Sequence, residues 1–521
     1  MLRFLKKKRL EAKGLSCGKT RRSAGERDTR ESLEASPYIR VGIILIAAAL
    51  LFLFSFADEA AEPLRHFLYA VLILAFAVIQ PWLSRESPVR DNSKLALYLM
   101  IILLQVGVAQ LLLYEVSTGY LAARILPLVI PVALAPITLS VLLGSQTALM
   151  GTLSGTLWIM ILQRDPAPQL MLMGLTGGLS AVLATLRVRR RSRLLRAGFY
   201  SGIAVWLVAL LSGVIVAFSP SDLSAADWGN FGLESALAIG TGIVTAVIIS
   251  GSLPLLEQLF GITTEISWLE MADLNHPLLR RLSLEAPGTY HHSLAMANLA
   301  ESCAERVGAN ATLCRVSSYF HDIGKLAKPE YFTENMPSGE NPHDELTPTM
   351  SALVILSHVK EGVDLALRNK LNRRVIDAIQ QHHGTSVVEY FYQKACMQER
   401  DARAGGTLMN VRPEDIPKVS EESFRYPGPK PQSIETVILG LADAAESASR
   451  SLERPTPQRL DDLVHDILQD RIDDGQYDEA PVTLCQLQEI AATLVASLGS
   501  MHHSRIAYGR RKDDKHPVGK D

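Results

Sequence analysis

Residues 316–325 have the sequence VSSYFHDIGK, and this stretch determines the predicted fold of the second half of the chain. Its apolar residues recur at helical spacing and lead directly into His321 and Asp322. The helix is expected to end at Gly324, which places both polar side chains and Lys325 at its C-terminal end. Imidazole and carboxylate groups are ligands that divalent metal ions accept. The stretch therefore predicts a helical domain with metal-binding groups at a helix end.

Further imidazoles and carboxylates lie on or beside helix-like runs on both sides of this stretch. The candidate metal ligands are His292, His321, Asp322, His358, His382, His383 and Asp443. Nitrogen and oxygen ligands in this number suit two divalent ions with one carboxylate between them as a bridge. The set predicts a phosphoester hydrolase. Strand-like alternation is scarce in this half, so we expect an all-α domain.

Two parts of this set leave alternatives open. His382 and His383 would point about 100° apart on a regular helix, so they converge only if the backbone turns at Gly384. A polar helix end is the alternative there. Asp443 lies among apolar residues, which favours an inward ligand over a carboxylate on the helix surface.

The dipeptide His-Asp occurs twice more in the second half. His465 and Asp466 lie on an amphipathic helix with acidic neighbours, where a solvated face is the favoured interpretation. His343 and Asp344 follow a turn-forming Asn-Pro pair, so His343 is a candidate for the lining of a substrate pocket.

The first half consists largely of apolar runs near the length of a bilayer crossing. We expect eight spans, at 41–57, 66–83, 95–114, 125–143, 147–162, 170–186, 197–218 and 236–255. The fourth and fifth are separated by only three residues, so they are the least distinct. The chain is therefore predicted to be a polytopic α-helical membrane bundle followed by the all-α domain.

Basic residues orient the predicted bundle. They gather in residues 1–36 and in the loop 187–196, whereas the loops 58–65 and 219–234 are neutral to acidic. Lys and Arg near span ends stay on the cytoplasmic side, so both termini are expected there, as an even number of spans requires. No cleavable signal peptide is expected, because the charged start is long and no small-residue cleavage pattern follows the first apolar run.

The remaining predictions concern domain limits, charge and thiols. We expect a basic cytoplasmic N-terminal segment (1–36), a membrane domain of about eight helices (37–255), a juxtamembrane connector broken by Pro254 and Gly261 (256–285), the hydrolase domain (286–455) with a long loop at 403–431, a C-terminal helical region (456–500) and a disordered polar tail (501–521). A net charge of −2 argues against a nucleic-acid polymer as partner. The five cysteines lack Cys-x-x-Cys spacing and are expected to be free.

Seven motifs resemble one known family. They are DLNHPLL (273–279), APGTYHHS (286–293), HDIGK (321–325), NPHD (341–344), SHVK (357–360), HHGT (382–385) and YPGPKP (426–431). Together they look like the seven-transmembrane receptor HD hydrolases, whose characterised members are bacterial cyclic di-AMP phosphodiesterases. That family normally has an extracellular domain after the first span, and here only residues 58–65 occupy that place. The chain therefore looks like a variant without the external domain.

The resemblance implies how the ligands divide between two manganese or iron ions. One ion would take His292, His321, Asp322 and Asp443, the other would take His358, His382 and His383, and Asp322 would bridge them. His292 is preferred to its neighbour His291, because the residue directly before Ser293 matches the common HD pattern. His291 is then expected to line the pocket.

The resemblance also implies the activity. We expect a membrane-anchored phosphodiesterase of the bacterial inner membrane that hydrolyses cyclic di-AMP to linear pApA, by attack of a hydroxide shared by two metal ions. Asp322 and Lys325 are the catalytic candidates, with Lys325 on a phosphate oxygen or the leaving group. The candidate substrate contacts are His291, His343, Tyr426 and Lys430. The lipid bilayer and the cyclic dinucleotide are the predicted partners, with a homodimer left open.

Alternatives to this activity also remain. One is a hydrolase of the same type that acts on cyclic di-GMP or another nucleotide, because nothing in the residue pattern distinguishes adenine from guanine. The other is a noncatalytic dinucleotide receptor, against which the complete ligand set argues.

Overall fold

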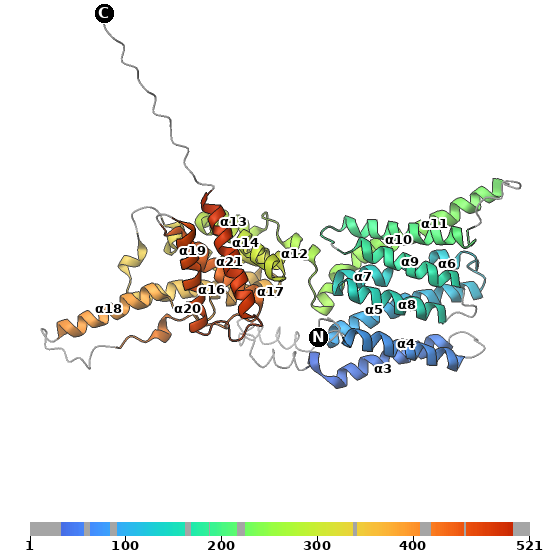
Figure 1. The fold of residues 1–521 in the computed structure, drawn as a ribbon, viewed down its shortest axis with the longest axis horizontal. Helices are drawn as coiled ribbons and strands as arrows, with labels where there is room; N and C mark the ends of the chain where they lie inside the picture. Colours follow the sequence, from blue (N-terminus) through green and yellow to red (C-terminus); the bar gives the residue numbers. More distant parts are fainter. Residues whose placement is uncertain are drawn as a thin grey trace, which may run out of the picture. The chain divides into compact units, whose positions relative to one another are not determined.

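The computed structural model describes residues 33–56, 63–83, 91–161, 168–186, 188–215, 225–336, 341–406, 418–452 and 455–503. Residue contacts divide the chain into two units, Met1–Ile266 and Ser267–Asp521. In the ranges described, both units are built from helices, and an isolated bridge between Val387 and Arg425 is the sole β-type pairing. The all-α prediction is confirmed, and the finer division into six segments remains a prediction (Figure 1).

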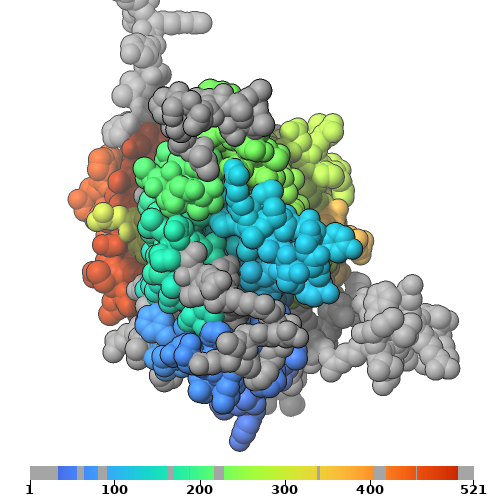
Figure 2. Space-filling model, turned by 90° about the vertical axis from the view of Figure 1, so that its right-hand side faces the viewer, coloured from blue at the N-terminus to red at the C-terminus, as the bar shows by residue number. Residues whose placement is uncertain are grey.

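The first unit contains nine described helices. They are α3 (Pro37–Phe56), α4 (Pro63–Leu83), α5 (Asn92–Ser117), α6 (Leu126–Val129), α7 (Leu134–Leu143), α8 (Ser145–Ile161), α9 (Pro168–Ala184), α10 (Ser192–Leu211) and α11 (Ala225–Phe260). Figure 2 shows one end of this unit, with α3 and α4 in blue on one side and α11 in green on the other. Every expected span falls at least partly on a helix of this bundle.

Five described ranges are long and apolar enough to cross a membrane. They are Pro37–Ser55, Asn92–Ser117, Leu126–Leu143, Ser192–Leu211 and Trp228–Phe260. Leu64–Ile79 and Pro168–Ala184 are shorter apolar helices. The chain is therefore a multi-pass membrane protein, while the count of eight spans stays a prediction.

Three details of the bundle differ from expectation. The fourth expected span is interrupted before α7, where the backbone around Pro131 leaves the helix. The seventh ends as helix at Leu211 instead of residue 218, because Gly213 adopts a left-handed φ of 72°. Pro254 lies inside α11 and does not end it. A proline in a membrane-type helix removes one N–H donor, and the remaining helix tolerates that loss.

The second part of the chain continues from α11 with ten α-helices in the described ranges. They are α12 (Glu265–Met271), α13 (Pro277–Glu285), α14 (Pro287–Val307), α15 (Ala311–Phe320), α16 (Pro348–Arg368), α17 (Arg373–Gln381), α18 (Glu389–Gly406), α19 (Ile434–Arg450), α20 (Pro457–Asp473) and α21 (Leu484–His503). Short 3-10 helices, including η2 (Ile323–Ala327), η4 (Thr333–Asn335) and η5 (Pro342–Glu345), connect α15 to α16.

Two apolar clusters hold the helices that carry the candidate ligands. One joins α14 and α19 to α20 and α21, through buried residues such as Met296, Leu439, Leu460 and Ile490. The other packs α13, α14, α15 and α17 together around Phe320 and its apolar neighbours. The C-terminal helices are thus part of the core of this unit.

Some predictions fall on residues outside the described ranges. The basic segment is described only from residue 33, and the tail only as far as His503, where α21 ends. The expected loop at 403–431 begins as helix, because α18 continues to Gly406, and residues 407–417 lie outside the description. The four described cysteines are free: Cys303, Cys314, Cys396 and Cys485.

Candidate metal centre

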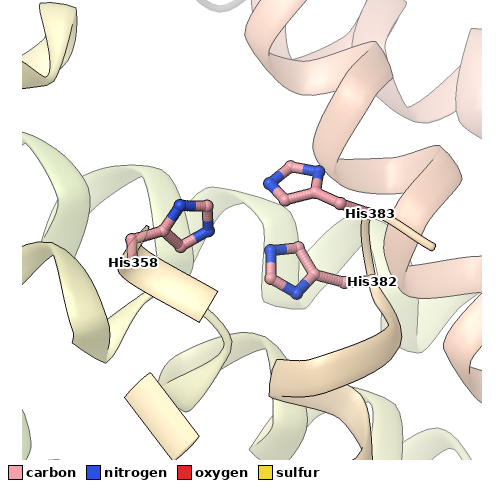
Figure 3. Close-up of side chains that lie close together, drawn as sticks. All are labelled: His358, His382 and His383. Carbon is pink, nitrogen blue, oxygen red and sulfur yellow. The ribbon is translucent and has the colours of Figure 1, made fainter. Parts of the chain in front are cut away.

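Five elements of the second unit bring the seven candidate ligands together. His292 lies on α14, the pair His321 and Asp322 follows α15, His358 lies on α16, the pair His382 and His383 follows α17, and Asp443 lies on α19. Three overlapping groups have ligand atoms within 4.8 Å of one another: His292 with His321 and Asp322, His321 with His382 and Asp443, and His358 with His382 and His383. Figure 3 shows the rings of the last group turned toward a common space.

Backbone carbonyls orient three of the imidazoles in the same way. In each, ring atom Nδ1 lies within hydrogen-bond distance of the carbonyl oxygen three residues earlier. The pairs are His321 with Ser318 (2.7 Å), His358 with Ile355 (2.6 Å) and His382 with Ile379 (2.9 Å). A carbonyl oxygen accepts only from a protonated Nδ1, so Nε2 is left with a free lone pair.

Those free nitrogens are buried. The atoms His321 Nε2, His358 Nε2, His382 Nε2 and Asp322 Oδ1 are inaccessible to solvent and have no hydrogen-bond partner among the described residues. Burying a polar atom without a partner costs about 1–3 kcal/mol. These converging lone pairs fit a site for divalent metal ions, because a bound ion would supply the partner that each atom lacks.

Asp322 lies between the histidines. His358 Nε2 and His382 Nε2 are 3.4 and 3.8 Å from Oδ1, and His321 Nε2 is 3.1 Å from Oδ2. Burial acts to raise the pKa of Asp322, but its interactions with His321 and with the charge of Lys325 hold that pKa well below its ordinary value. The carboxylate is therefore ionised and faces nitrogens from three elements, as a bridging ligand must.

His292 contacts two carboxylates. Its Nε2 lies 3.0 Å from Asp443 Oδ1, and its Nδ1 lies 2.6 Å from Glu446 Oε2. Burial lowers the pKa of His292, but hydrogen bonds to Asp443 and Glu446 outweigh burial and raise it to about 10. The sequence analysis missed Glu446. It lies three residues after Asp443 on α19, so helical spacing alone could have indicated it.

His383 completes the group after α17. Its Nδ1 lies 3.8 Å from Asp443 Oδ2, and its ring stacks on Tyr426 at 4.2 Å and 24°. Burial, with His382 beside it, lowers its pKa well below the ordinary value, so the ring is neutral. Gly384 has a φ of +57°, which turns the chain as expected and lets adjacent histidines face one site.

The end of α15 differs from the prediction. The helix ends at Phe320, and Gly324 lies within the 3-10 helix η2. A Cβ atom on Gly324 would lie 1.8 Å from the carbonyl oxygen of His358. This glycine therefore permits α16 to approach η2 closely, which brings His358 to Asp322.

Lys325 is a largely buried ion-pair partner, 14% exposed, rather than an exposed helix-end lysine. Its Nζ lies 2.7 Å from Asp322 Oδ2 and 2.7 Å from Glu334 Oε1, and 4.9 Å from the centre of the Phe332 ring. Burial acts against the cation, but Asp322 and Glu334 raise the pKa of Lys325 above its ordinary value. Glu334 comes from the short helix η4, which has no periodic pattern that could have indicated its role.

The candidate substrate contacts divide into two kinds. Tyr426 contacts the centre through His383, and His291 is exposed beside the buried His292. His343 is buried with Nε2 2.8 Å from the carbonyl of Tyr331, and Lys430 Nζ donates to the carbonyl of Gly475 at 2.7 Å. Each of these last two makes a polar contact within the protein, while His343 Nδ1 is buried without a hydrogen-bond partner among the described residues.

Of the two further His-Asp pairs, neither joins the ligand groups in the described part of the chain. His465 and Asp466 are exposed on α20, which agrees with the predicted solvated face.

Comparison with known families follows the same division of the chain. Residues 61–264 match the family described as "7TM receptor with intracellular HD hydrolase", and residues 289–448 match the HD domain. The chain belongs to this family of 7TM receptor HD hydrolases. The resemblance in the sequence motifs is thereby confirmed.

Members of the family with curated names resemble this chain over most of its length. The cyclic-di-AMP phosphodiesterase PgpH of Listeria monocytogenes is 36% identical over 387 residues, which are 74% of this chain and 50% of that protein. PgpH of Bacillus subtilis is 36% identical over 415 residues, which are 79% of this chain and 54% of that protein. The chain thus spans about half the length of these relatives.

Among solved structures, the HD domain of L. monocytogenes phosphodiesterase PgpH in complex with cyclic-di-AMP is similar to the chain. It is 42% identical in sequence, covers 44% of this chain and 99% of its own, and has a TM-score of 0.40.

Proposed function

We propose that the chain is a membrane-anchored, metal-dependent phosphodiesterase that hydrolyses cyclic di-AMP to linear pApA. The observation that carries this proposal is the set of buried, unpartnered imidazole nitrogens around the ionised carboxylate of Asp322. The names of the curated relatives support cyclic di-AMP as the substrate.

The residues that would hold the metal divide into two sets. His292, His321, Asp322 and Asp443 would bind one ion and His358, His382 and His383 the other, with Asp322 shared; manganese or iron suits these nitrogen and carboxylate ligands. Two such ions would supply Lewis-acid polarisation of the phosphodiester.

The other side chains position these ligands and the substrate. Glu446 holds the ring of His292, and the three backbone carbonyls hold the rings of His321, His358 and His382. Lys325 carries a positive charge beside Asp322 and would contact a phosphate oxygen or the leaving group. We propose substrate contacts for Tyr426, His291, His343 and Lys430; His343 Nε2 and Lys430 Nζ also bond within the protein.

The proposed orientation rests on the basic loops. Both termini and the unit Ser267–Asp521 would face the cytoplasm of a bacterial inner membrane, because basic residues gather in the sequence before α3 and before α10, and Lys and Arg near span ends stay on the cytoplasmic side. A homodimer remains a prediction.

The test uses the full chain purified in detergent. Metal content would be measured first, and then turnover of equal amounts of cyclic di-AMP, cyclic di-GMP and pApA with Mn²⁺ or Fe²⁺. We expect conversion of cyclic di-AMP to pApA, with pApA left intact. Metal-loaded protein that ignores cyclic di-AMP while it cleaves another substrate would contradict the proposal, and protein that binds dinucleotide without cleaving it would indicate a receptor.

A further inference from the structure

The turn between α20 and α21 contacts the segment that carries His382 and His383. This turn lies outside the residues 289–448 that match the HD domain. Its central side chain, Gln476, is 2% exposed, although an amide has no place in an apolar core. A buried amide at this position needs hydrogen-bond partners, and those partners are next to the metal-binding histidines.

Gln476 binds the residue two positions after His383. Its Oε1 accepts from the backbone N–H of Thr385 at 2.9 Å, and its Nε2 donates to Thr385 Oγ1 at 2.9 Å and to Asp474 Oδ2 at 2.8 Å. A Cβ atom on Gly384 would lie 2.2 Å from Gln476 Oε1. The glycine therefore permits both the left-handed turn and the approach of the amide.

A second set of contacts ties the same turn to the ring that covers His383. The Arg425 guanidinium donates to both carboxylate oxygens of Asp474, at 3.0 and 3.1 Å, and to the carbonyl of Thr385 at 2.8 Å. The next residue, Tyr426, stacks on His383. The α20–α21 turn thus holds the backbone after the two histidines and, through Arg425, the aromatic ring packed against one of them.

We infer that Gln476 is a positioning residue for the metal-binding group of His358, His382 and His383. It fixes the turn at Gly384, and that turn directs two adjacent imidazoles toward one ion. The C-terminal helices outside the HD match are therefore a working part of the metal centre. The inference rests on the proposed metal binding, but it does not depend on which substrate is cleaved.

The experiment compares three variants of the full chain in detergent. Gln476→Met keeps the side-chain length and removes the hydrogen bonds. Gln476→Glu combined with Asp474→Asn keeps the acceptor for the Thr385 N–H and exchanges the amide and the carboxylate of the Gln476–Asp474 contact. Gln469→Met removes an exposed amide contact, to Asp473, on the neighbouring helix α20. Each metal-free protein would be titrated with Mn²⁺ alone, and free Mn²⁺ measured by electron paramagnetic resonance.

We expect Gln476→Met to bind the weaker of the two ions about 10-fold less tightly, as loss of a residue that orients ligands typically does. The exchange Gln476→Glu with Asp474→Asn should recover most of that affinity, and Gln469→Met should equal the wild type. Recovery by the exchange separates hydrogen bonding to the Thr385 backbone from packing, because methionine and glutamate at position 476 have similar volumes.

Two results would overturn the inference. One is wild-type Mn²⁺ affinity in Gln476→Met, and the other is an equal loss in Gln476→Met and in the exchange Gln476→Glu with Asp474→Asn. If the variants show the expected Mn²⁺ affinities but the protein does not hydrolyse cyclic di-AMP, the proposed function is contradicted and the inference about Gln476 is supported.

Discussion

Replacing Lys325 by methionine should destabilise the metal-free protein strongly. Lys325 Nζ lies 2.7 Å from carboxylate oxygens of both Asp322 and Glu334, and the three side chains are 14%, 2% and 18% exposed. Removing one partner of a buried ion pair costs about 3–5 kcal/mol, because an uncompensated charge remains. Methionine nearly preserves the volume, so the loss reports the charge rather than a cavity.

The loss of stability can be measured as a decrease in the unfolding temperature. For a unit of this size, a loss of 1 kcal/mol lowers the midpoint by roughly 2–4 °C, so the Lys325→Met protein should unfold on the order of 10 °C lower in the presence of a chelator. The added change Glu334→Gln should recover part of the loss, because it removes one of the two unpaired charges. Saturating Mn²⁺ should also reduce the loss, since cations bound at Asp322 would replace the ammonium.

The measurement is thermal unfolding of the full chain in detergent, with and without metal, for wild type, both single variants and the double variant. Glu334→Gln alone is the control. Its loss should be smaller, because Lys325 keeps Asp322 as its partner. A Lys325→Met protein as stable as the wild type without metal, or no recovery in the double variant, would refute the electrostatic reasoning.

Other predictions test the ligands, the unit and the pH dependence. Asp322→Ala should abolish hydrolysis while the membrane unit stays folded, and near-normal turnover by a variant with verified metal content would contradict the two-metal centre. His292→Ala should hold close to one ion per chain and His291→Ala two by elemental analysis; the reverse would move the ligand by one residue. Ser267–Asp521 expressed alone should hydrolyse cyclic di-AMP, and a strict need for earlier residues would mean that part of the site lies there. In metal-free protein, the pKa of His292 rises from about 6.5 in the unfolded state to about 10 in the folded state. The stabilising contribution of His292 is therefore complete below about pH 6.5 and is lost as the pH rises through 10. Unfolding temperatures that do not fall over that pH range would contradict this assignment.

Local pattern was enough to predict the helices and the residue types of the centre. The apolar spacing before His321 and the run that leads into His358 predicted α15 and α16, because helical periodicity depends on neighbours within a few residues. The turn at Gly384 was also predictable, since only the residue's own backbone freedom is involved. The ends of helices were less predictable. Pro254 lies inside α11, because the free-energy cost of a proline within a helix depends on the surrounding structure rather than on the proline alone.

Tertiary structure decided which of these groups meet. Helical spacing does not distinguish His291 from His292, and only the resemblance to the HD pattern favoured His292. The packing of α14 against α19 turns His292 toward Asp443 and leaves His291 exposed. Glu446 and Gln476 contact His292 and Thr385 across 154 and 91 residues of sequence, so only the fold brings each pair into contact. Which side chains could bind metal was evident from the residue types alone, because metal-binding capacity is a property of each side chain. Only the fold determined their partners, because a hydrogen bond or an ion pair depends on distances of a few ångströms that distant segments set together.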